Sequence, residues 1–187
     1  PGGTAELVLA LGAMLTGGLH GAGLSDTADG LFGGWTRERR LEIMKDSRVG
    51  SYGVLAILLV TLARWSALTA VLAQDGQWAA LIATGALSRA PMALIMALLP
   101  NARGEGLSHA TGRPSPVTAL VGLALATGLA VLAAGWGALF LCLAVLITAL
   151  LLSLLALRKI GGQTGDILGA SQQLAETACL TVLSAWA

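Results

Sequence analysis

Two pairs of carboxylates stand close together near the start of the chain, at spacings that suit a divalent cation. Asp26 and Asp29 are three residues apart, and Glu42 and Asp46 are four apart. Residues at these spacings share one face of a helix, and hard cations such as Mg²⁺ are held by carboxylate oxygens. We therefore interpret the four side chains as candidate metal ligands. For Glu42 and Asp46, a solvated helix with ion pairs along its surface explains the pattern equally well.

Basic side chains interleave with the second acidic pair and indicate what a metal there would bind. Lys45 and Arg48 belong to the same short block as Glu42 and Asp46. Carboxylate-bound Mg²⁺ beside Lys and Arg suits a pyrophosphate, whose remaining oxygens accept hydrogen bonds from the cations. His20 is a candidate base or ligand, but a polar residue at the edge of an apolar segment is the simpler interpretation.

Two further arginines fall where a charge is costly. Arg64 and Arg89 lie near the centres of long apolar runs, where a charged residue costs about 2.5–3.5 kcal/mol on a translocon scale. Pairing with Glu176 or Glu6 and contact with an anionic substrate are equally favoured roles. Ser88 adds a small polar group beside Arg89.

The segment 161–166, Gly-Gly-Gln-Thr-Gly-Asp, is similar in composition to a phosphate cradle. Glycines before a helix leave backbone N–H groups free to meet an anion. The segment lacks the lysine of a P-loop, so the pattern alone is weak.

The composition indicates which elements must position these groups. The 187 residues are 56% hydrophobic and 11% charged, with a mean hydropathy of +0.80, whereas soluble domains carry about 25% charged residues. A water-soluble fold of this size could not bury so much apolar surface, so the lipid bilayer must act as the solvent of this chain. Secreted, cytosolic and nucleic-acid-binding domains are therefore excluded, and no nucleic acid is expected as a partner. A second copy of the chain is a candidate partner.

Apolar runs predict about six membrane-spanning helices. A helix needs about 20 residues to cross a hydrocarbon core of about 30 Å. Suitable runs cover residues 4–19, 52–73, 78–99, 117–134, 138–157 and 167–187, with turns expected at 74–77 and at Gly135-Trp136-Gly137. We expect an all-α, polytopic membrane helical bundle that forms a single integral membrane domain over residues 1–187.

Charge assigns the polar segments to one side of the membrane. Loops rich in Lys and Arg face the cytoplasm. All nine basic residues of the predicted loops fall on one side: Arg37, Arg39, Arg40, Lys45, Arg48, Arg103, Arg113, Arg158 and Lys159. The site is therefore expected at the cytoplasmic mouth of the bundle.

Together these motifs resemble the cobalamin synthase family. The resemblance covers nearly the whole chain. Its main blocks are Gly-Gly-Leu-His-x-x-Gly-Leu-x-Asp-Thr-x-Asp-Gly at 17–30 and Leu-Glu-Ile-Met-Lys-Asp-Ser-Arg-x-Gly at 41–50. Three further matches follow in the same order: Ser88-Arg89, Ala102-Arg103-x-Glu105-Gly106-Leu107, and the block 161–170.

The resemblance implies a Mg²⁺-dependent transferase of the bacterial inner membrane, an adenosylcobinamide-GDP ribazoletransferase. Adenosylcobinamide-GDP and α-ribazole, or its 5′-phosphate, would give adenosylcobalamin, or its 5′-phosphate, and GMP. The ribazole 5′-hydroxyl would attack the cobinamide-linked phosphorus of the pyrophosphate, and GMP would leave.

The resemblance also distributes roles among the candidate residues. The expected Mg²⁺ ligands are Asp26, Asp29, Glu42 and Asp46. The expected substrate-binding residues are Lys45, Arg48, Ser88, Arg89 and Arg103. Asp166 would complete the metal site or orient the nucleophile, and the general base would be His20 or one of the carboxylates.

The chain departs from the family pattern in two places. The family reads His-x-Asp-Gly-Leu-Ala-Asp, whereas Ala22 stands here at the first aspartate, on the helical face of Asp26 and Asp29. Weaker metal binding, a different number of metal ions and an inactive protein are the alternative consequences. Family members also carry a further amino-terminal stretch, which this chain is expected to lack.

Two other classes compete with this interpretation. CDP-alcohol phosphotransferases open their motif with aspartates spaced like Asp26 and Asp29, but the Ala-Arg expected shortly afterwards is replaced by Gly33-Gly34. A membrane transporter is the second alternative, because charged residues lie within the predicted spans. Against a transporter, no inverted repeat is evident, and the polar residues gather on one side.

Overall fold

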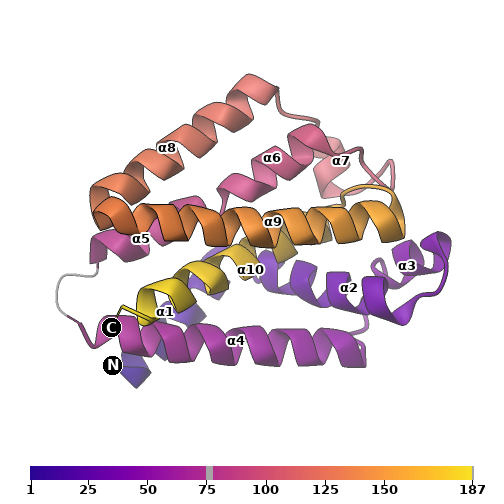
Figure 1. Ribbon diagram of the computed structural model, residues 1–187. Coiled ribbons are helices and arrows are strands. Elements are labelled where there is room, and N and C mark those ends of the chain that lie inside the picture. Colours follow the sequence, from indigo (N-terminus) through magenta and orange to yellow (C-terminus); the bar gives the residue numbers. More distant parts are fainter. Residues whose placement is uncertain (75–77, 187) are drawn as a thin grey trace.

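The computed structural model describes residues 1–74 and 78–186, and their regular structure is helical (Figure 1). In chain order the helices are α1 (Gly2–Leu15), α2 (Leu19–Gly33), α3 (Arg37–Ile43), α4 (Ser51–Leu72), α5 (Trp78–Leu87), α6 (Ala90–Leu98), α7 (Leu107–Thr111), α8 (Pro116–Ala134), the 3₁₀ turn η1 (Gly135–Gly137), α9 (Ala138–Ile160) and α10 (Gly165–Ser184). Within the described ranges, extended backbone pairs only in an isolated bridge between Asn101 and Gln163. The prediction of an all-α chain is confirmed.

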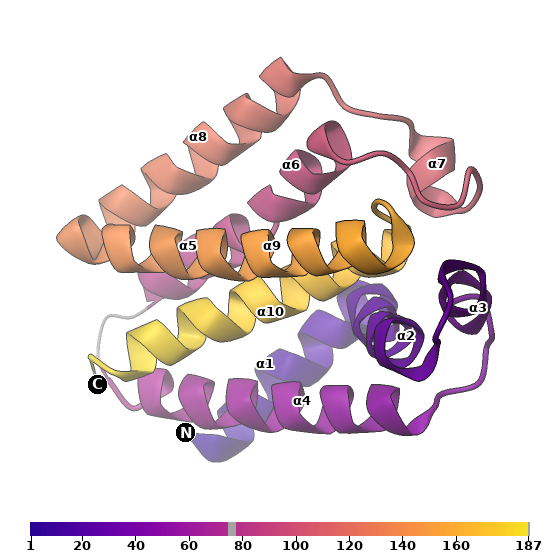
Figure 2. The same cartoon turned by 45° about the vertical axis from the view of Figure 1, so that its right-hand side comes forward.

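Three helical stretches are long and apolar enough to cross a membrane: Ser51–Leu72, Trp78–Leu98 and Pro116–Ile160. The bent pair α1 and α2 makes a fourth if it counts as one span. The longest stretch folds back at η1, as the glycine-rich turn predicted, so α8 and α9 form a hairpin (Figure 2). α10 is not among these candidates, because polar residues such as Gln172, Gln173 and Glu176 interrupt its apolar sequence. By this criterion the chain has fewer candidate spans than the six predicted.

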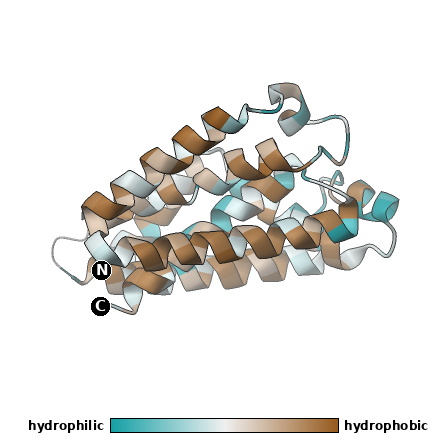
Figure 3. Ribbon diagram, turned by 45° about the horizontal axis from the view of Figure 1, so that its top comes forward, coloured by the Kyte–Doolittle hydropathy of each residue, from teal (hydrophilic) through white to brown (hydrophobic). Residues whose placement is uncertain are grey.

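The central helix of the bundle is α10, which packs against α2, α4 and α9 (Figure 2). Its buried side chains include Ile167, Ala175 and Cys179. Many large apolar side chains of α4, α8 and α9 are exposed instead, and those exposed by more than 60% include Leu59, Leu125, Leu132 and Leu151. Figure 3 shows the long helices of the bundle mostly in the brown of hydrophobic residues. An apolar exterior around a core that contains polar groups is the arrangement that a lipid environment requires.

Two predicted spans are interrupted, and each interruption has a local cause. Gly17 and Gly18 adopt φ values of +59° and +69°, which glycine tolerates, and α1 and α2 meet there at 86°. In the run 78–99, Pro91 lies in the first turn of α6. Proline cannot donate a hydrogen bond to the preceding turn, so α5 ends at Leu87. Most of the turn predicted at 74–77, and the last residue of the run 167–187, lie outside the described residues.

Glycines bring α2 and α10 into close contact. A Cβ at Gly23 would lie 2.9 Å from the backbone oxygen of Asp166 and 3.3 Å from the Cα of Gly169. A backbone cannot rotate away as a flexible side chain can, so an added methyl group would push the two helices apart. Gly23 therefore holds the next turn of α2, which carries Asp26, beside the start of α10.

This packing predicts opposite effects for two glycine substitutions on one helix. Gly23→Ala is expected to lower the free energy of unfolding by about 1–3 kcal/mol, the usual cost of overpacking. Gly21→Ala is the matched control, because a Cβ there would meet nothing within 4 Å and alanine has the higher helix propensity. Thermal unfolding of the two variants checks the prediction. Equal midpoints would contradict a close contact at Gly23.

Candidate functional site

The amino end of α10 carries a carboxylate that is paired with an arginine. The Arg103 Nη2 atom lies 2.8 Å from Asp166 Oδ2, and the two side chains are only 12% and 19% exposed. The Thr164 hydroxyl caps the helix by accepting from the Ile167 N–H, and it donates to the same Asp166 oxygen at 3.2 Å. Because the pair is largely shielded from solvent, salt screens it weakly.

The loop that carries Arg103 is held by backbone hydrogen bonds. Residues 100–102 and Gln163 are joined by two such bonds of 2.8 Å each. The Asn101 Oδ1 atom accepts from the N–H groups of Arg103 and Gly104, at 3.0 and 2.8 Å. The loop after α6 and the loop before α10 are therefore fastened together, which fixes the guanidinium at the amino end of α10.

Asp26, which belongs to α2, lies near this ion pair and has no partner of its own among the described residues. Its side chain is partly exposed, and it experiences the charges of Asp166, Arg103 and Asp29. Within the described part of the chain, no hydrogen bond or ion pair engages its carboxylate. An unpaired carboxylate close to a second carboxylate is a position that suits a bound cation.

Asp29 stands three residues further along α2 but has a different environment. Its side chain is buried, Oδ2 accepts from the Gly50 N–H at 2.7 Å, and Oδ1 accepts from the Gly53 N–H at 2.9 Å. Gly53 lies in the first turn of α4, where orphan N–H groups and the helix dipole favour a negative charge. A Cβ at Gly53 would collide with Asp29 and Ser25. Both oxygens of this predicted metal ligand are therefore engaged by the backbone of the chain itself.

The second predicted acidic pair lines a separate pocket of about 290 Å³, formed by Arg39, Glu42, Ile43, Lys45, Asp46 and Arg48. The prediction that Glu42 and Asp46 share a helical face is wrong, because α3 ends at Ile43. For the same reason Lys45 and Arg48 do not share a helical face. A larger groove of about 830 Å³ on α8 is apolar and is lined by none of the predicted residues.

Every charged side chain of this pocket has a partner. Arg39 pairs with Glu42 at 2.8 Å, Arg48 pairs with Asp46 at 2.6 Å, and Lys45 pairs with Glu105. The hydrogen bond from the Arg48 guanidinium lowers the pKa of the Asp46 carboxyl to about 2. Across residues 1–74 and 78–186, no three His, Cys, Asp or Glu side chains are grouped so as to hold a metal. The four predicted carboxylates are thus not brought into one cluster.

A second polar group lies between the helices, where α4 and α10 approach the break between α5 and α6. Arg64 forms an ion pair with Glu176 at 2.8 Å and donates to Gln173 Oε1 at 2.7 Å. Gln172 Nε2 donates to Glu176 at 2.6 Å and to Ser88 Oγ at 3.3 Å. Of the two partners predicted for Arg64, Glu176 is confirmed. Ser88 belongs to this interhelical group.

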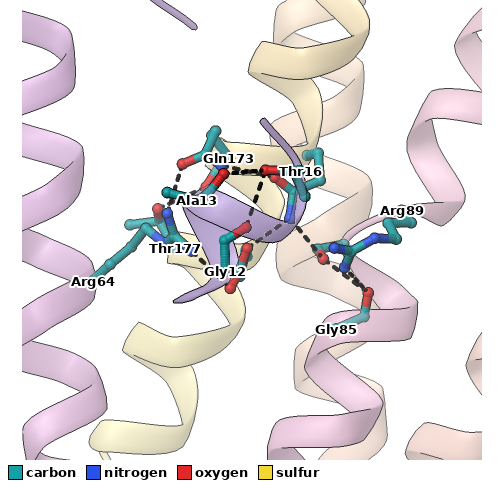
Figure 4. Close-up of polar contacts among 11 residues, drawn as sticks. Gly12, Ala13, Thr16, Arg64, Gly85, Arg89, Gln173 and Thr177 are labelled. Carbon is teal, nitrogen blue, oxygen red and sulfur yellow. Dashed lines mark hydrogen bonds and ion pairs between the residues drawn. The ribbon is translucent and has the colours of Figure 1, made fainter. Parts of the chain in front are cut away.

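Arg89 and His20 also lie near this group. Figure 4 shows Arg64 and Arg89 on opposite sides of the carboxyl end of α1. Arg89 donates to the Gly85 carbonyl at 2.6 Å, and no described carboxylate pairs with it. His20 experiences the charges of Arg89, Glu176 and Arg64. The candidate substrate-binding residue Arg89 therefore lies beside the interhelical group.

The glycine-rich segment 161–166 uses part of its backbone internally. The Gly161 N–H donates to carbonyls of the last turn of α9, and the Gln163 N–H donates to Pro100. Gly161 takes a left-handed conformation, with a φ of +78°, that ends α9. The amides of Gly161 and Gln163 are therefore not free for an anion, and the predicted cradle is reduced to Gly162 and residues 164–166.

Two positioning residues were missed at the level of sequence. Asn101 orders the Arg103 loop, and a signal for it was present, because asparagine near glycine is typical of turns. Arg37 donates to the carbonyls of Ile160 and Ala102, at 2.8 and 3.1 Å, and so ties α3 to the site. Nothing in the local pattern distinguished this arginine from its basic neighbours.

The fold and the site define an α-helical protein of membrane type with an arginine–carboxylate centre at one end. The family model described as cobalamin-5-phosphate synthase matches residues 2–184, and the chain belongs to this family. The resemblance noted in the sequence is thereby confirmed.

The chain is similar to several proteins named adenosylcobinamide-GDP ribazoletransferase. With that of Bradyrhizobium diazoefficiens it shares 47% identity over 183 residues, which is 97% of this chain and 70% of the relative. With that of Azorhizobium caulinodans it shares 48% over 174 residues, 89% of this chain and 66% of the relative. With that of Mesorhizobium japonicum it shares 45% over 184 residues, 98% of this chain and 71% of the relative. No solved structure matches the chain significantly.

Proposed function

We propose that this chain is an adenosylcobinamide-GDP ribazoletransferase. It joins adenosylcobinamide-GDP to α-ribazole, or to its 5′-phosphate, to give adenosylcobalamin, or its 5′-phosphate, and GMP. Family membership and the names of three relatives support the proposal. In this reaction the ribazole 5′-hydroxyl oxygen forms a bond to the cobinamide-linked phosphorus, and the bond from that phosphorus to the bridging oxygen breaks as GMP leaves.

The observation that carries the proposal is the unpaired carboxylate of Asp26 beside the Arg103–Asp166 ion pair. Phosphoryl transfer depends on positioned cations at the phosphate oxygens. Arg103 supplies a shielded cation, and its Nε has no hydrogen-bond partner among the described residues. Lys45 and Arg48 are the proposed contacts for the remaining phosphate oxygens, because their pocket connects to the Arg103 loop through the Lys45–Glu105 ion pair.

Mg²⁺ is part of the proposal, and the donors near Asp26 suit it. Proteins commonly hold Mg²⁺ with one or two carboxylates, and substrate phosphates complete the coordination. Asp26 and Asp166 are two carboxylates that lie close enough for the negative charge of Asp166 to act on Asp26. Bound by them, Mg²⁺ would offset negative charge on the phosphate oxygens. Glu42 and Asp46 suit it less well, since both of them are paired with an arginine, whereas of Asp26 and Asp166 only Asp166 is.

The proton of the attacking hydroxyl needs an acceptor, for which His20 and the carboxylates are the proposed candidates. His20 stands six residues before Asp26 on the same helix, a rise of about 9 Å along its axis. Its ring is partly exposed, and imidazole is a side chain that can accept a proton from a hydroxyl within hydrogen-bond reach. Ser88 and Arg89, which lie in or beside the polar group between the helices, remain proposed substrate contacts.

We place the protein in the bacterial inner membrane, in a bundle of about six spans whose site faces the cytoplasm. The ends of α2 and α9 and the start of α4 lie at the same end of the bundle (Figure 1). The sequence places Arg37, Arg48, Arg158 and Lys159 in or beside these segments. At the other end of α9, Trp136 is 92% exposed, and Trp78 at the start of α5 is 65% exposed. Basic loops favour the cytoplasmic side, and tryptophan is enriched at membrane interfaces.

The test is GMP release by the purified chain in lipid vesicles, supplied with adenosylcobinamide-GDP, α-ribazole and Mg²⁺. We expect release that requires both substrates and that stops when EDTA removes the metal. CMP release from a CDP-alcohol would instead support a CDP-alcohol phosphotransferase. Movement of the cobinamide across the vesicle membrane without GMP release would support a transporter.

The same assay tests the missing carboxylate at position 22. Ala22 is exposed on α2, four residues before Asp26 and therefore on the same face. Ala22→Asp is expected to lower the Mg²⁺ concentration needed for half-maximal GMP release several-fold, because it adds an oxygen ligand. Ala22→Asn is the control, with nearly the same shape and no charge. If the two variants needed the same Mg²⁺ concentration, the residue at position 22 would not be part of the metal site.

A further inference from the structure

The ends of α2 and α9 and the start of α4 lie at one end of the bundle (Figure 1), and these segments carry both aromatic and basic residues. Phe32, Trp35 and Tyr52 are 54%, 93% and 50% exposed. Arg158 is exposed, whereas Arg40 and Lys159 are partly exposed. We call this set the aromatic–basic collar, and it consists of Phe32, Trp35, Arg40, Tyr52, Arg158 and Lys159.

Direct contacts connect four members of the collar. The Phe32 and Tyr52 ring centroids lie 6.0 Å apart, and Lys159 Nζ lies 4.4 Å from the Phe32 centroid. Lys159 Nζ donates to the Leu31 carbonyl at 2.6 Å, and Arg40 Nη1 donates to the Lys159 carbonyl at 3.1 Å. These four side chains are therefore held together on one surface, although they come from four different helices. Trp35 follows Phe32 by three residues, and Arg158 directly precedes Lys159.

No carboxylate of the described residues forms an ion pair with a basic side chain of the collar. None of the ion pairs among the described residues includes Arg40, Arg158 or Lys159. Arg40 and Lys159 donate to carbonyls at the ends of α2 and α9, where the helix dipole contributes only about half a negative charge per helix. The collar therefore keeps a net positive charge that an anionic ligand would complement.

We propose that the aromatic–basic collar binds the headgroup of an anionic phospholipid. The phosphate meets the basic side chains, while the rings lie at the level of the headgroups, as aromatic residues do at membrane interfaces. Trp35 favours a lipid over a soluble phosphate, because it presents nearly its whole indole outward with no hydrogen bond to the described residues. The proposal rests on the membrane placement proposed above and is independent of transferase activity.

Quenching of Trp35 fluorescence by brominated lipid tests the proposal. The full chain is reconstituted in phosphatidylcholine that contains a small fraction of brominated phosphatidylglycerol, or the same fraction of brominated phosphatidylcholine. The contribution of Trp35 is the difference between the native chain and Trp35→Phe, since four other tryptophans are present. We expect the anionic lipid to quench Trp35 more strongly than the zwitterionic lipid does. Equal quenching by the two lipids overturns the proposal.

Charge variants then locate the site. Arg158→Gln is expected to lower the excess quenching about fivefold, the effect of one basic residue at an anionic surface, and Arg158→Lys is expected to retain it. Arg158 makes no hydrogen bond or ion pair with the described residues, so the fold does not depend on it. Arg113→Gln is the matched control, a basic residue outside the collar that donates to the Ala97 carbonyl. An unchanged excess in Arg158→Gln, or an equal loss in Arg113→Gln, overturns the proposal.

A soluble competitor distinguishes the source of the phosphate. Inorganic phosphate is added at an ionic strength matched with sodium chloride. If the anionic lipid is the ligand, excess quenching falls equally with both salts, through general screening. A selective loss with inorganic phosphate would show that the collar takes a free anion and would overturn the lipid assignment.

Discussion

Replacing Asp26 by asparagine is expected to lower the rate of GMP release about 10²–10³-fold, the usual loss when one electrostatic contact of a transition state is removed. The thermal unfolding midpoint is expected to stay unchanged. Asp26 makes no hydrogen bond or ion pair with the described residues, so asparagine breaks no contact that holds the fold. The substitution removes one of the two carboxylates proposed to hold Mg²⁺ and leaves the Arg103–Asp166 ion pair in place. Turnover and unfolding of the same preparation check both parts.

Asp46→Asn provides the matched control for this experiment. Asp46 is also a candidate ligand on a polar segment, but Arg48 already neutralises it. Its replacement is expected to change GMP release less than tenfold, by analogy with the small energies of exposed ion pairs. If Asp46→Asn proved the more damaging of the two, the metal would belong in the outer pocket rather than beside Asp166.

The largest loss of stability is expected from Asp29→Ala. The substitution leaves two N–H groups at the start of α4 without their acceptor, and the free energy of unfolding is expected to fall by about 3 kcal/mol. For a chain of this length, that corresponds to a midpoint lowered by about 6–12 °C. The loss occurs because the buried carboxylate of Asp29 caps α4 and joins it to α2 by two hydrogen bonds. Thermal unfolding in detergent, without substrate or metal, measures the effect separately from catalysis.

Asp29→Asn distinguishes capping from metal binding. Asparagine keeps one acceptor oxygen and therefore one of the two hydrogen bonds, so its midpoint is expected between those of the native chain and Asp29→Ala. If Asp29 were a metal ligand with no capping role, Asp29→Ala and Asp29→Asn would both unfold at the native midpoint in the presence of EDTA. That outcome would return Asp29 to the metal site predicted from its spacing.

The sequence by itself determined the class of protein and most of its helices. Apolar runs of membrane length follow from composition, and α4, α8 and α9 begin within one residue of the positions predicted for them. The hairpin at Gly135–Gly137 was also predictable, because glycine marks turns locally. The breaks at Gly17-Gly18 and before Pro91 carried the same kind of local signal. Hydropathy averaged over a whole run obscured them.

Only the tertiary structure decided which carboxylates meet. Spacing along a helix shows that Asp26 and Asp29 lie on similar faces, but their side chains still differ by about 60° around the axis. Because of that difference, the Asp29 side chain points toward the start of α4, where it accepts two hydrogen bonds. Asp26 lies instead near Asp166, which stands 140 residues later in the sequence. Arg103 likewise reaches Asp166 because two distant loops pair through their backbones. The polar site depends on how α2, α4 and α10 pack against one another. Packing between segments that are distant in the sequence leaves no periodic pattern in the chain, so the sequence alone could not predict this site.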